Sequence, residues 1–244
     1  MSGESGVPVM RPALIYTGGI SHPFEAAAPT LGGILEEVGL QPEVTFDLDR
    51  VLALLSQRPE ALLVVYALRW SMTQNEKYAP DRARWAMSMP AGARLAIAGH
   101  VRAGGGLLGL HTASICFDDW PEWGAVLGGR WRWGTSHHPA LGPVAAALGR
   151  EDVLTRGLAD FTVTDEAYSE LDVEPSARVV ATVTGVGSVR PQPAVWMYEY
   201  GRGRAVYDSL GHDSASINHP IHRRLIQRAA LWASGEANDL VEAR

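Results

Sequence analysis

The stretch GGGLLGLHTASICFDD, residues 104 to 119, decides the fold. Its glycines are followed by the apolar run LLGL, which stops sharply at the polar His111 among small neighbours. A buried strand that ends in a polar residue at a tight turn is how α/β enzymes present a reactive side chain at the carboxyl edge of a sheet. Here that residue is an imidazole, and the single cysteine of the chain, Cys116, comes five residues later.

Similar apolar runs precede this stretch and alternate with segments of helical period. The alternation is typical of βα units and predicts an α/β fold with a doubly wound, mostly parallel sheet flanked by helices. In such sheets, sites lie at the carboxyl ends of the strands. The expected strands are residues 13–19, 42–48, 61–68 and 106–111, and the expected helices are residues 24–39 and 90–106.

The second half of the chain changes character. Residues 128–148 carry tryptophans, prolines and a His pair, a composition that indicates strand and loop. Strands are expected at 178–183 and within 193–213, the latter a hairpin that turns at residues 201–203. An amphipathic helix over 219–235 follows. With no repeat or linker, the organisation is a single domain over residues 13–235, with a flexible arm at 1–12 and a tail at 236–244.

Composition narrows the classes of function. The chain has 244 residues, 46% of them hydrophobic, and a formal net charge of −6, so neither nucleic acid nor an anionic membrane is an expected partner. One cysteine excludes an internal disulfide framework and a cysteine-based zinc site. No leader-like segment and no long apolar run is present. These features predict a cytoplasmic protein with a small-molecule partner.

Histidines gather at the predicted strand ends. His111 is either a metal ligand or general acid/base at the sheet edge, or a structural residue bonded to the following amides. His212 also ends a strand, with Asp213 as an orienting partner, or it is a plain turn residue. In the pair His137-His138 we expect one ring to point inward.

Two adjacent carboxylates, Asp165 and Glu166, follow the strand-like FTVT. Their directions alternate in an extended segment, so at most one should face the site, unless Asp165 caps a helix instead. Cys116 lies in an apolar setting that disfavours a thiolate, so we expect it to pack. Core packing, sugar stacking and a subunit interface of a homo-oligomer are three interpretations of Trp120, Trp123, Trp131 and Trp133.

An ordered set of motifs over residues 13 to 235 resembles the ThuA-like (trehalose utilisation) family: GGGLLGLHTAS, LGGRW, the HP of HHP, LTRGLADFTVTDEAY, PAVWMYEYGRGRAVYDSLGHD and RRLIQRAALWASG. The resemblance implies a flavodoxin-like fold similar to that of class I glutamine amidotransferases. In that superfamily the elbow reads G-x-C-x-G, and His111 stands in the position of the thiol. His212 matches the late histidine, whereas position 214, where a glutamate is expected, is serine. Cysteine-dependent glutamine hydrolysis is therefore not expected.

The family resemblance also implies a role in disaccharide catabolism, beside sugar dehydrogenases that make 3-keto sugars. We therefore expect a sugar-catabolic enzyme, a lyase, isomerase or hydrolase, that acts on a disaccharide or keto-glycoside by histidine and carboxylate chemistry, with metal assistance as an option. The catalytic candidates are His111, His212 and Glu166, and the candidate ligands of a divalent metal (Zn, Mn or Ni) are His111, His212 and Asp165. The candidate substrate-binding residues are Gly18, Gly19, His138, Tyr168, Trp131 and Asp213.

Two other classes of function are compatible with the sequence. One is a non-catalytic module that binds carbohydrate or protein, which would keep the aromatic residues without needing the histidines. The other is a hydrolase of a different type, such as an amidase that uses Ser114 or Thr112 with an adjacent base.

Overall fold

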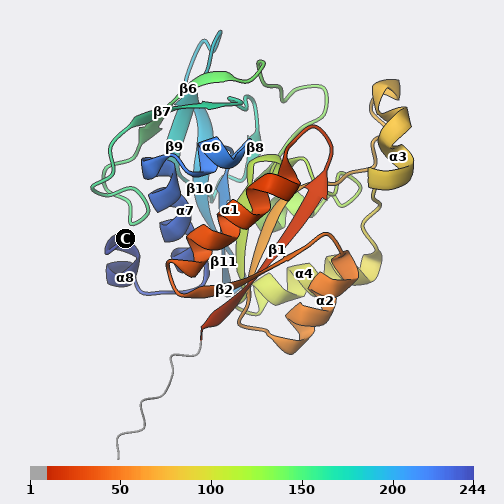
Figure 1. The fold of residues 1–244 in the computed structure, drawn as a ribbon, viewed down its shortest axis with the longest axis horizontal. Helices are drawn as coiled ribbons and strands as arrows, with labels where there is room; N and C mark the ends of the chain where they lie inside the picture. The colour runs from red at the N-terminus through yellow and green to blue at the C-terminus, as the bar shows by residue number, and fades with distance from the viewer. Residues whose placement is uncertain (1–9) are drawn as a thin grey trace, which may run out of the picture.

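Nine strands form the central sheet of the computed structural model, which describes residues 10–244 (Figure 1). Their order is β2-β1-β3-β4-β11-β10-β9-β6-β7, and the short strands β5 and β8 pair separately. The bounds are β1 Arg11–Gly19, β2 Leu40–Thr45, β3 Leu62–Leu68, β4 Gly106–Leu110, β5 Gly129–Arg130, β6 Gly142–Leu148, β7 Phe161–Asp165, β8 Asp172–Val173, β9 Arg178–Thr184, β10 Gln192–Tyr200 and β11 Gly203–Asp208.

The first half of the sheet is parallel, from the edge strand β2 through β1, β3 and β4 to β11. Every residue of β3 is buried, as expected for an apolar strand covered on both faces. The expected strand over 42–48 ends earlier, at Thr45, because Asp47 begins a helix and its side chain accepts a hydrogen bond from the Asp49 amide at 2.9 Å. The expected α/β fold, flavodoxin-like and doubly wound, is confirmed.

The second half of the sheet is antiparallel, through β10, β9, β6 and β7. The expected hairpin is present, with β10 ending at Tyr200 and β11 beginning at Gly203. Each antiparallel pairing reverses the chain direction. After four reversals from β11, strand β7 again runs in the direction of the parallel strands, so its carboxyl end reaches the same edge of the sheet.

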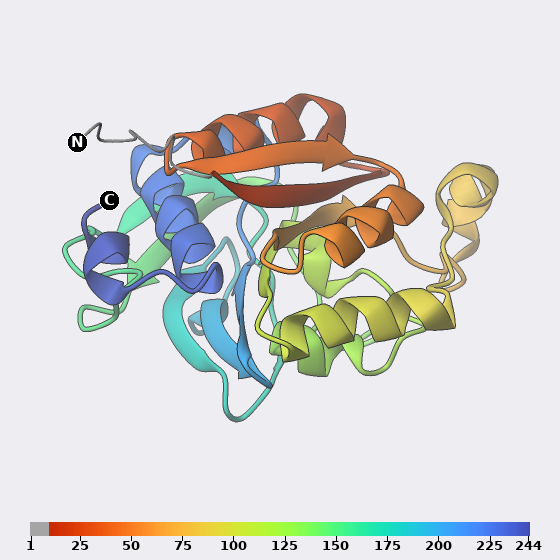
Figure 2. The same cartoon turned by 90° about the horizontal axis from the view of Figure 1, so that it is seen from below.

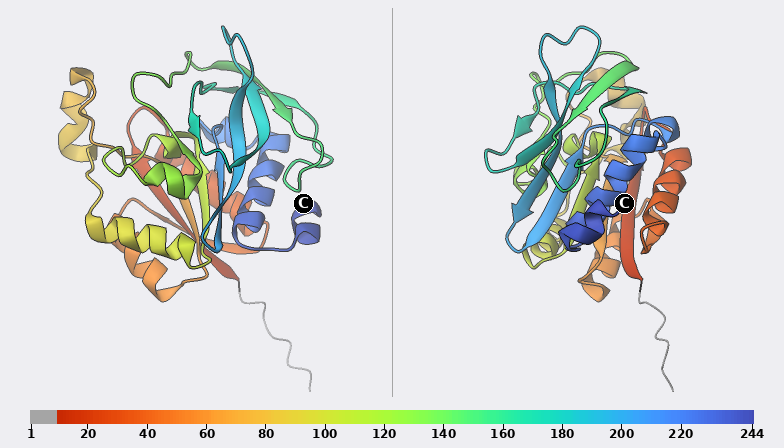
Figure 3. Two further views of the ribbon diagram at one scale, coloured as in Figure 1. Left: turned by 180° about the vertical axis from the view of Figure 1, so that it is seen from behind. Right: turned by 90° about the vertical axis from the view of Figure 1, so that its left-hand side faces the viewer.

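Helices cover both faces of the sheet (Figure 2). α1 (Phe24–Glu36) and α7 (Pro220–Ala233) pack on one face, and α2 (Leu48–Gln57) and α4 (Ala91–Arg102) on the other, each pair over its own hydrophobic core. α3 and the antiparallel strands lie on opposite sides of the molecule (Figure 3). The shorter helices are η1 Glu76–Tyr78, α3 Ala79–Trp85, η2 His111–Ser114, α5 Trp123–Leu127, α6 Ser214–Ile217 and α8 Asn238–Glu242.

Within residues 10–244, parts of the expected arm and tail form regular structure. β1 begins at Arg11, so the last part of the expected arm is strand, and residues 1–9 lie outside the described residues. In the expected tail, Val241 of α8 is fully buried, and Arg228 donates to the backbone oxygens of Glu242 and Arg244. Within residues 10–244, no helix combines the length and the apolar character needed to cross a membrane.

Candidate active site

Four side chains meet at the carboxyl edge of the sheet, and we call them the His–Glu cluster: His22, His111, Glu166 and His212. They follow β1, β4, β7 and β11 respectively. One nitrogen or carboxylate oxygen of each lies within 4.8 Å of the corresponding atoms of the others. The parallel direction of these four strands is what brings residues distant in sequence to one place.

His111 sits on a tight elbow between β4 and η2. Its φ of 49° lies in the left-handed region, which costs a residue other than glycine about 1–3 kcal/mol. Two contacts hold it there: its Nδ1 is 2.8 Å from the carbonyl oxygen of Ser209, and its own carbonyl accepts from the Tyr207 hydroxyl at 2.7 Å. The side chain is fully buried. The elbow therefore fixes the ring and aims its other nitrogen, Nε2, at Glu166.

Glu166 lies among four imidazoles. Its Oε2 is 3.4 Å from Nε2 of His111 and 3.6 Å from Nε2 of His22, and this oxygen is buried without a hydrogen-bond partner. Its Oε1 is 3.6 Å from Nδ1 of His138 and 3.7 Å from Nδ1 of His212. The Nδ1 of His212 is likewise buried and unpartnered.

The charges of the cluster follow from this arrangement. Burial raises the pKa of Glu166, but the rings of His111, His212 and His22 lower it by more, so the pKa lies below its ordinary value. Glu166 in turn raises the pKa of His212, whereas burial lowers the pKa of His22. Glu166 is thus an ionised carboxylate in a largely buried site.

Asp165 has a different role from its neighbour. Its Oδ2 accepts from the backbone amides of Gly211 at 2.8 Å and His212 at 3.3 Å, and its Oδ1 accepts from the Glu166 amide at 2.7 Å. We expected it as a metal ligand, but it lies outside the His–Glu cluster because its oxygens accept from the backbone amides of Gly211, His212 and Glu166. Only one of the adjacent carboxylates faces the site.

The sequence predicted that Asp213, Gly18 and Gly19 contact the substrate. In the structure, none of the three lines the pocket described next. The Asp213 carboxylate accepts from the Ser216 amide at 2.9 Å and caps α6. Gly18 and Gly19 line a separate pocket that shares only His22 with the pocket described next. Gly19 has a φ of 141°, and a Cβ there would collide with the carbonyl oxygen of Leu68.

A pocket of about 410 Å³ opens over Glu166 and His22. Tyr168, at its base, stacks on His111 with ring centroids 4.9 Å apart, and its hydroxyl is 3.4 Å from Nε2 of that histidine. His138 is more exposed and also lines the pocket. The aromatic residues of the wall are Trp70, Tyr78, Trp131, Trp133 and Tyr168.

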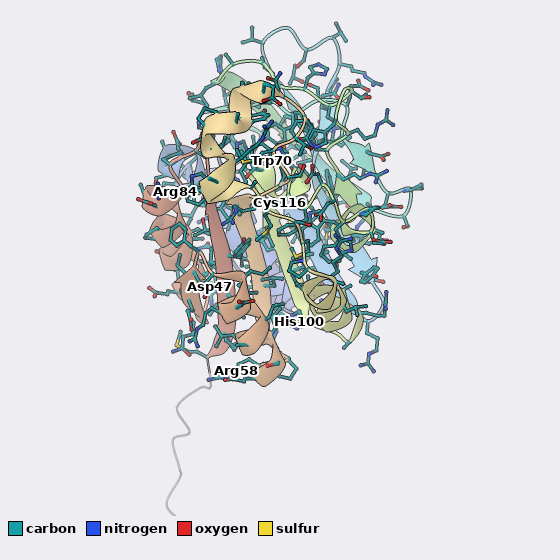
Figure 4. All side chains as sticks on the ribbon, turned by 90° about the vertical axis from the view of Figure 1, so that its right-hand side faces the viewer. Asp47, Arg58, Trp70, Arg84, His100 and Cys116 are labelled. Carbon is teal, nitrogen blue, oxygen red and sulfur yellow. The ribbon has the colours of Figure 1, made fainter. Side chains whose placement is uncertain are left out.

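The tryptophans of residues 120–133 divide into two groups. Trp120 and Trp123 are almost fully buried in the core beside α5. Trp131 and Trp133 line the pocket, and Trp133 stacks on Trp70 with centroids 6.2 Å apart. Figure 4 shows Trp70 beside α3, at the end of the molecule opposite His100.

No nucleophile of the cysteine or serine type is set up at the elbow. Burial raises the pKa of Cys116 to about 12, and its thiol donates to the Ala67 carbonyl at 3.0 Å. The Thr112 hydroxyl donates to the same carbonyl at 2.6 Å, and the Ser114 hydroxyl pairs with that of Tyr207 at 2.8 Å. The amidase interpretation required a base next to one of these hydroxyls, and the hydrogen bonds among residues 10–244 include no imidazole there.

His22 is the cluster member that sequence reasoning missed. The motif signals pointed to His111, His212 and Glu166, whereas His22 stands alone in the loop after β1. The available signal was its position three residues beyond the carboxyl end of that strand, where strand order reverses between β2 and β3. Such a switch point is where open α/β sheets place ligands.

Comparisons with known proteins agree with this architecture. A family model described as "ThuA: Trehalose utilisation" matches residues 13–233, whereas no curated protein matches the chain. A ThuA-like protein from Parabacteroides merdae has a TM-score of 0.73 at 19% identity, over 93% of this chain and 91% of that chain. One from Bacteroides uniformis has a TM-score of 0.66 at 17% identity, over 96% of this chain and 94% of that chain.

A more distant likeness is to part of the cold-adapted β-galactosidase from Rahnella sp. R3. The TM-score is 0.58 at 16% identity, over 93% of this chain but only 31% of that chain. At such identities the structural neighbours show the fold alone.

Proposed function

The chain belongs to the ThuA family, and on that premise we propose that it is an enzyme that transforms a disaccharide or keto-glycoside by proton transfer at the His–Glu cluster. The observation that carries the proposal is Glu166, an ionised carboxylate that lines a pocket walled by aromatic rings and has Oε1 3.7 Å from Nδ1 of His212. A carboxylate whose pKa is shifted by specific charged neighbours, set in a pocket, is a physical signature of a functional site.

The pocket suits a sugar ring. Its volume of about 410 Å³ lies within the range of small-molecule sites. Aromatic faces pack against the C–H face of a pyranose, while the polar groups at the base meet its hydroxyl or keto oxygens. Trp133 is 38% exposed and is free to take part in such stacking.

The chemistry follows from the acidity of a 3-keto sugar, in which the proton on C2 lies next to the carbonyl. Oε1 of Glu166 accepts that proton, and the Tyr168 hydroxyl or a histidine N–H stabilises the oxygen of the resulting enolate. The electron pair then forms the C1–C2 double bond, the glycosidic C1–O bond breaks, and the leaving oxygen takes a proton from His212. Return of the proton to the other face of C2 would instead isomerise the sugar.

The test is turnover of 3-keto-disaccharides, followed as release of the leaving sugar and as exchange of the C2 proton in deuterated water by NMR. We expect both reactions with the wild-type chain, and we expect both to be lost in His111→Ala and in His212→Ala. If the two variants keep full turnover, the proposal is wrong. Tight calorimetric binding without exchange or release would support the binding module in its place.

A further inference from the structure

Two imidazole nitrogens of the His–Glu cluster, Nε2 of His22 and Nε2 of His111, face each other. His111 Nδ1 lies 2.8 Å from the Ser209 carbonyl oxygen, and His22 Nδ1 lies 3.3 Å from the Ile20 carbonyl oxygen. Because a carbonyl only accepts, Nδ1 is the nitrogen that carries the proton when each ring is neutral, the form in which an imidazole binds a metal ion. Both Nε2 atoms are then bare lone pairs, and they are 3.0 Å apart.

A carboxylate oxygen lies close to both of these nitrogens. Glu166 Oε2 lies 3.4 Å from one of these nitrogens and 3.6 Å from the other, and it has no hydrogen-bond donor of its own. The buried Nδ1 of His212 is also unpartnered, 3.7 Å from the second oxygen of Glu166. Convergent lone pairs in a buried site repel one another, and a positive charge among them removes the repulsion.

We propose that His22, His111, His212 and Glu166 bind one divalent transition-metal ion. Ligand atoms about 2.1 Å from a tetrahedral ion lie about 3.4 Å from each other. The Nε2 atoms of His22 and His111 are 3.0 Å apart and lie 3.6 Å and 3.4 Å from Glu166 Oε2, and all four ligand atoms lie within 4.8 Å of one another. Three neutral imidazoles and a carboxylate suit zinc, nickel or manganese rather than calcium or magnesium, which favour sites made of oxygen.

The groups behind the four ligands support this assignment. The carbonyls of Ser209 and Ile20 orient the rings of His111 and His22 through their Nδ1 protons, as outer partners do in metal sites. Asp165 fixes the backbone of His212 and Glu166 from behind. The ligand set therefore contains His22 and Glu166, in place of the Asp165 expected from the sequence.

The experiment measures metal binding without reference to sugar turnover. The full chain is stripped with a chelator, and zinc, nickel, manganese and cobalt salts are titrated singly by calorimetry. The visible absorption of cobalt reports its coordination. We expect one ion per chain, a cobalt spectrum typical of nitrogen and oxygen ligands, and a higher midpoint of thermal unfolding with the ion than without it.

Three variants locate the site. His22→Gln and Glu166→Gln should each lose the one-to-one binding or weaken it by about tenfold or more, while circular dichroism shows an intact fold. The matched control is His138→Gln, which removes an imidazole equally near Glu166 but outside the cluster, and which should keep the stoichiometry.

Three results would overturn the inference: no ion bound by the wild-type chain, equal binding in all variants, or loss of binding in the control alone. Metal binding without sugar turnover would leave the inference standing and contradict the proposed function. Turnover by a chain that binds no metal would contradict this inference and leave the proposed function standing.

Discussion

The His222–Asp208 pair and the His–Glu cluster are both buried combinations of imidazole and carboxylate, but their polar atoms are paired differently. In the pair, His222 Nδ1 donates to the Ser216 carbonyl at 2.8 Å and Nε2 donates to the Asp208 carboxylate at 3.0 Å. Since both nitrogens face acceptors, the ring is doubly protonated and fully satisfied. In the cluster, the Nε2 atoms of His22 and His111 face each other at 3.0 Å, and Glu166 Oε2 has no partner.

The difference separates a structural role from a functional one. The second oxygen of Asp208, Oδ1, accepts from the Leu210 amide at 3.0 Å, so the satisfied pair holds the loop whose Ser209 carbonyl orients His111. A complete buried network rigidifies its surroundings, whereas an incomplete one keeps donor atoms available for a ligand. The first group should therefore matter for stability and the second for chemistry.

The largest expected effect is that of Glu166→Gln on turnover of a 3-keto-disaccharide. Loss of the base should lower kcat about 100- to 10,000-fold. The free energy of unfolding should fall modestly, because the folded chain lowers the pKa of Glu166 and the ionised group therefore contributes some stability at neutral pH. Steady-state kinetics and urea unfolding measure the two quantities. A marked loss of stability would show that the cluster has a structural role, as the His222–Asp208 pair does.

Asp208→Ala should mainly lower the free energy of unfolding rather than turnover. Removing one partner of a buried charged pair typically costs about 3–5 kcal/mol, because His222 is left charged or unsatisfied. Urea unfolding measures this change. The matched control is Asp172→Ala, which removes an exposed ion pair with Arg130 and should cost no more than about 1 kcal/mol. Equal costs for the two variants would contradict the structural role of the pair.

The pH dependence of stability should report the same pair. Burial lowers the pKa of His222, but Asp208, together with the Ser216 carbonyl and Asp165, raises it by more, so in the folded chain the pKa lies above its ordinary value of 6.5. The stabilisation from this group is complete below about pH 6.5 and is lost as the pH rises through the folded value. The stability difference between wild type and His222→Gln should therefore shrink from acid to alkaline pH. A difference that grows with pH would show that the ring is neutral when folded.

The smallest expected effect is that of His138→Ala, which marks the edge of the cluster. Its side chain is 36% exposed and its Nδ1 is 2.9 Å from the Pro139 carbonyl oxygen. Loss of a single peripheral polar contact should raise KM about threefold to tenfold and leave kcat nearly unchanged. A fall in kcat as large as that of Glu166→Gln would place His138 inside the reacting group.

Sequence reasoning named three of the four members of the candidate site, because these three lie where a local pattern changes. His111 and His212 end apolar strands, and Glu166 follows the alternating strand that became β7. The role of Asp213 was misassigned because an acidic residue beside a histidine looks the same in sequence whether it orients the ring or caps a helix. The short helix α2 was also missed, since its Asp47 cap lies inside the expected strand.

The sequence by itself determined the mostly parallel α/β fold and the elbow at His111, because both depend on local apolar runs and glycine positions. Only the tertiary structure decided which atoms meet. His22 and His111 are 89 residues apart, and Glu166 arrives at their edge because four antiparallel steps return β7 to the direction of β11. Such long-range placement decides whether a buried donor or acceptor finds a partner. By this criterion the His222–Asp208 pair differs from the His–Glu cluster.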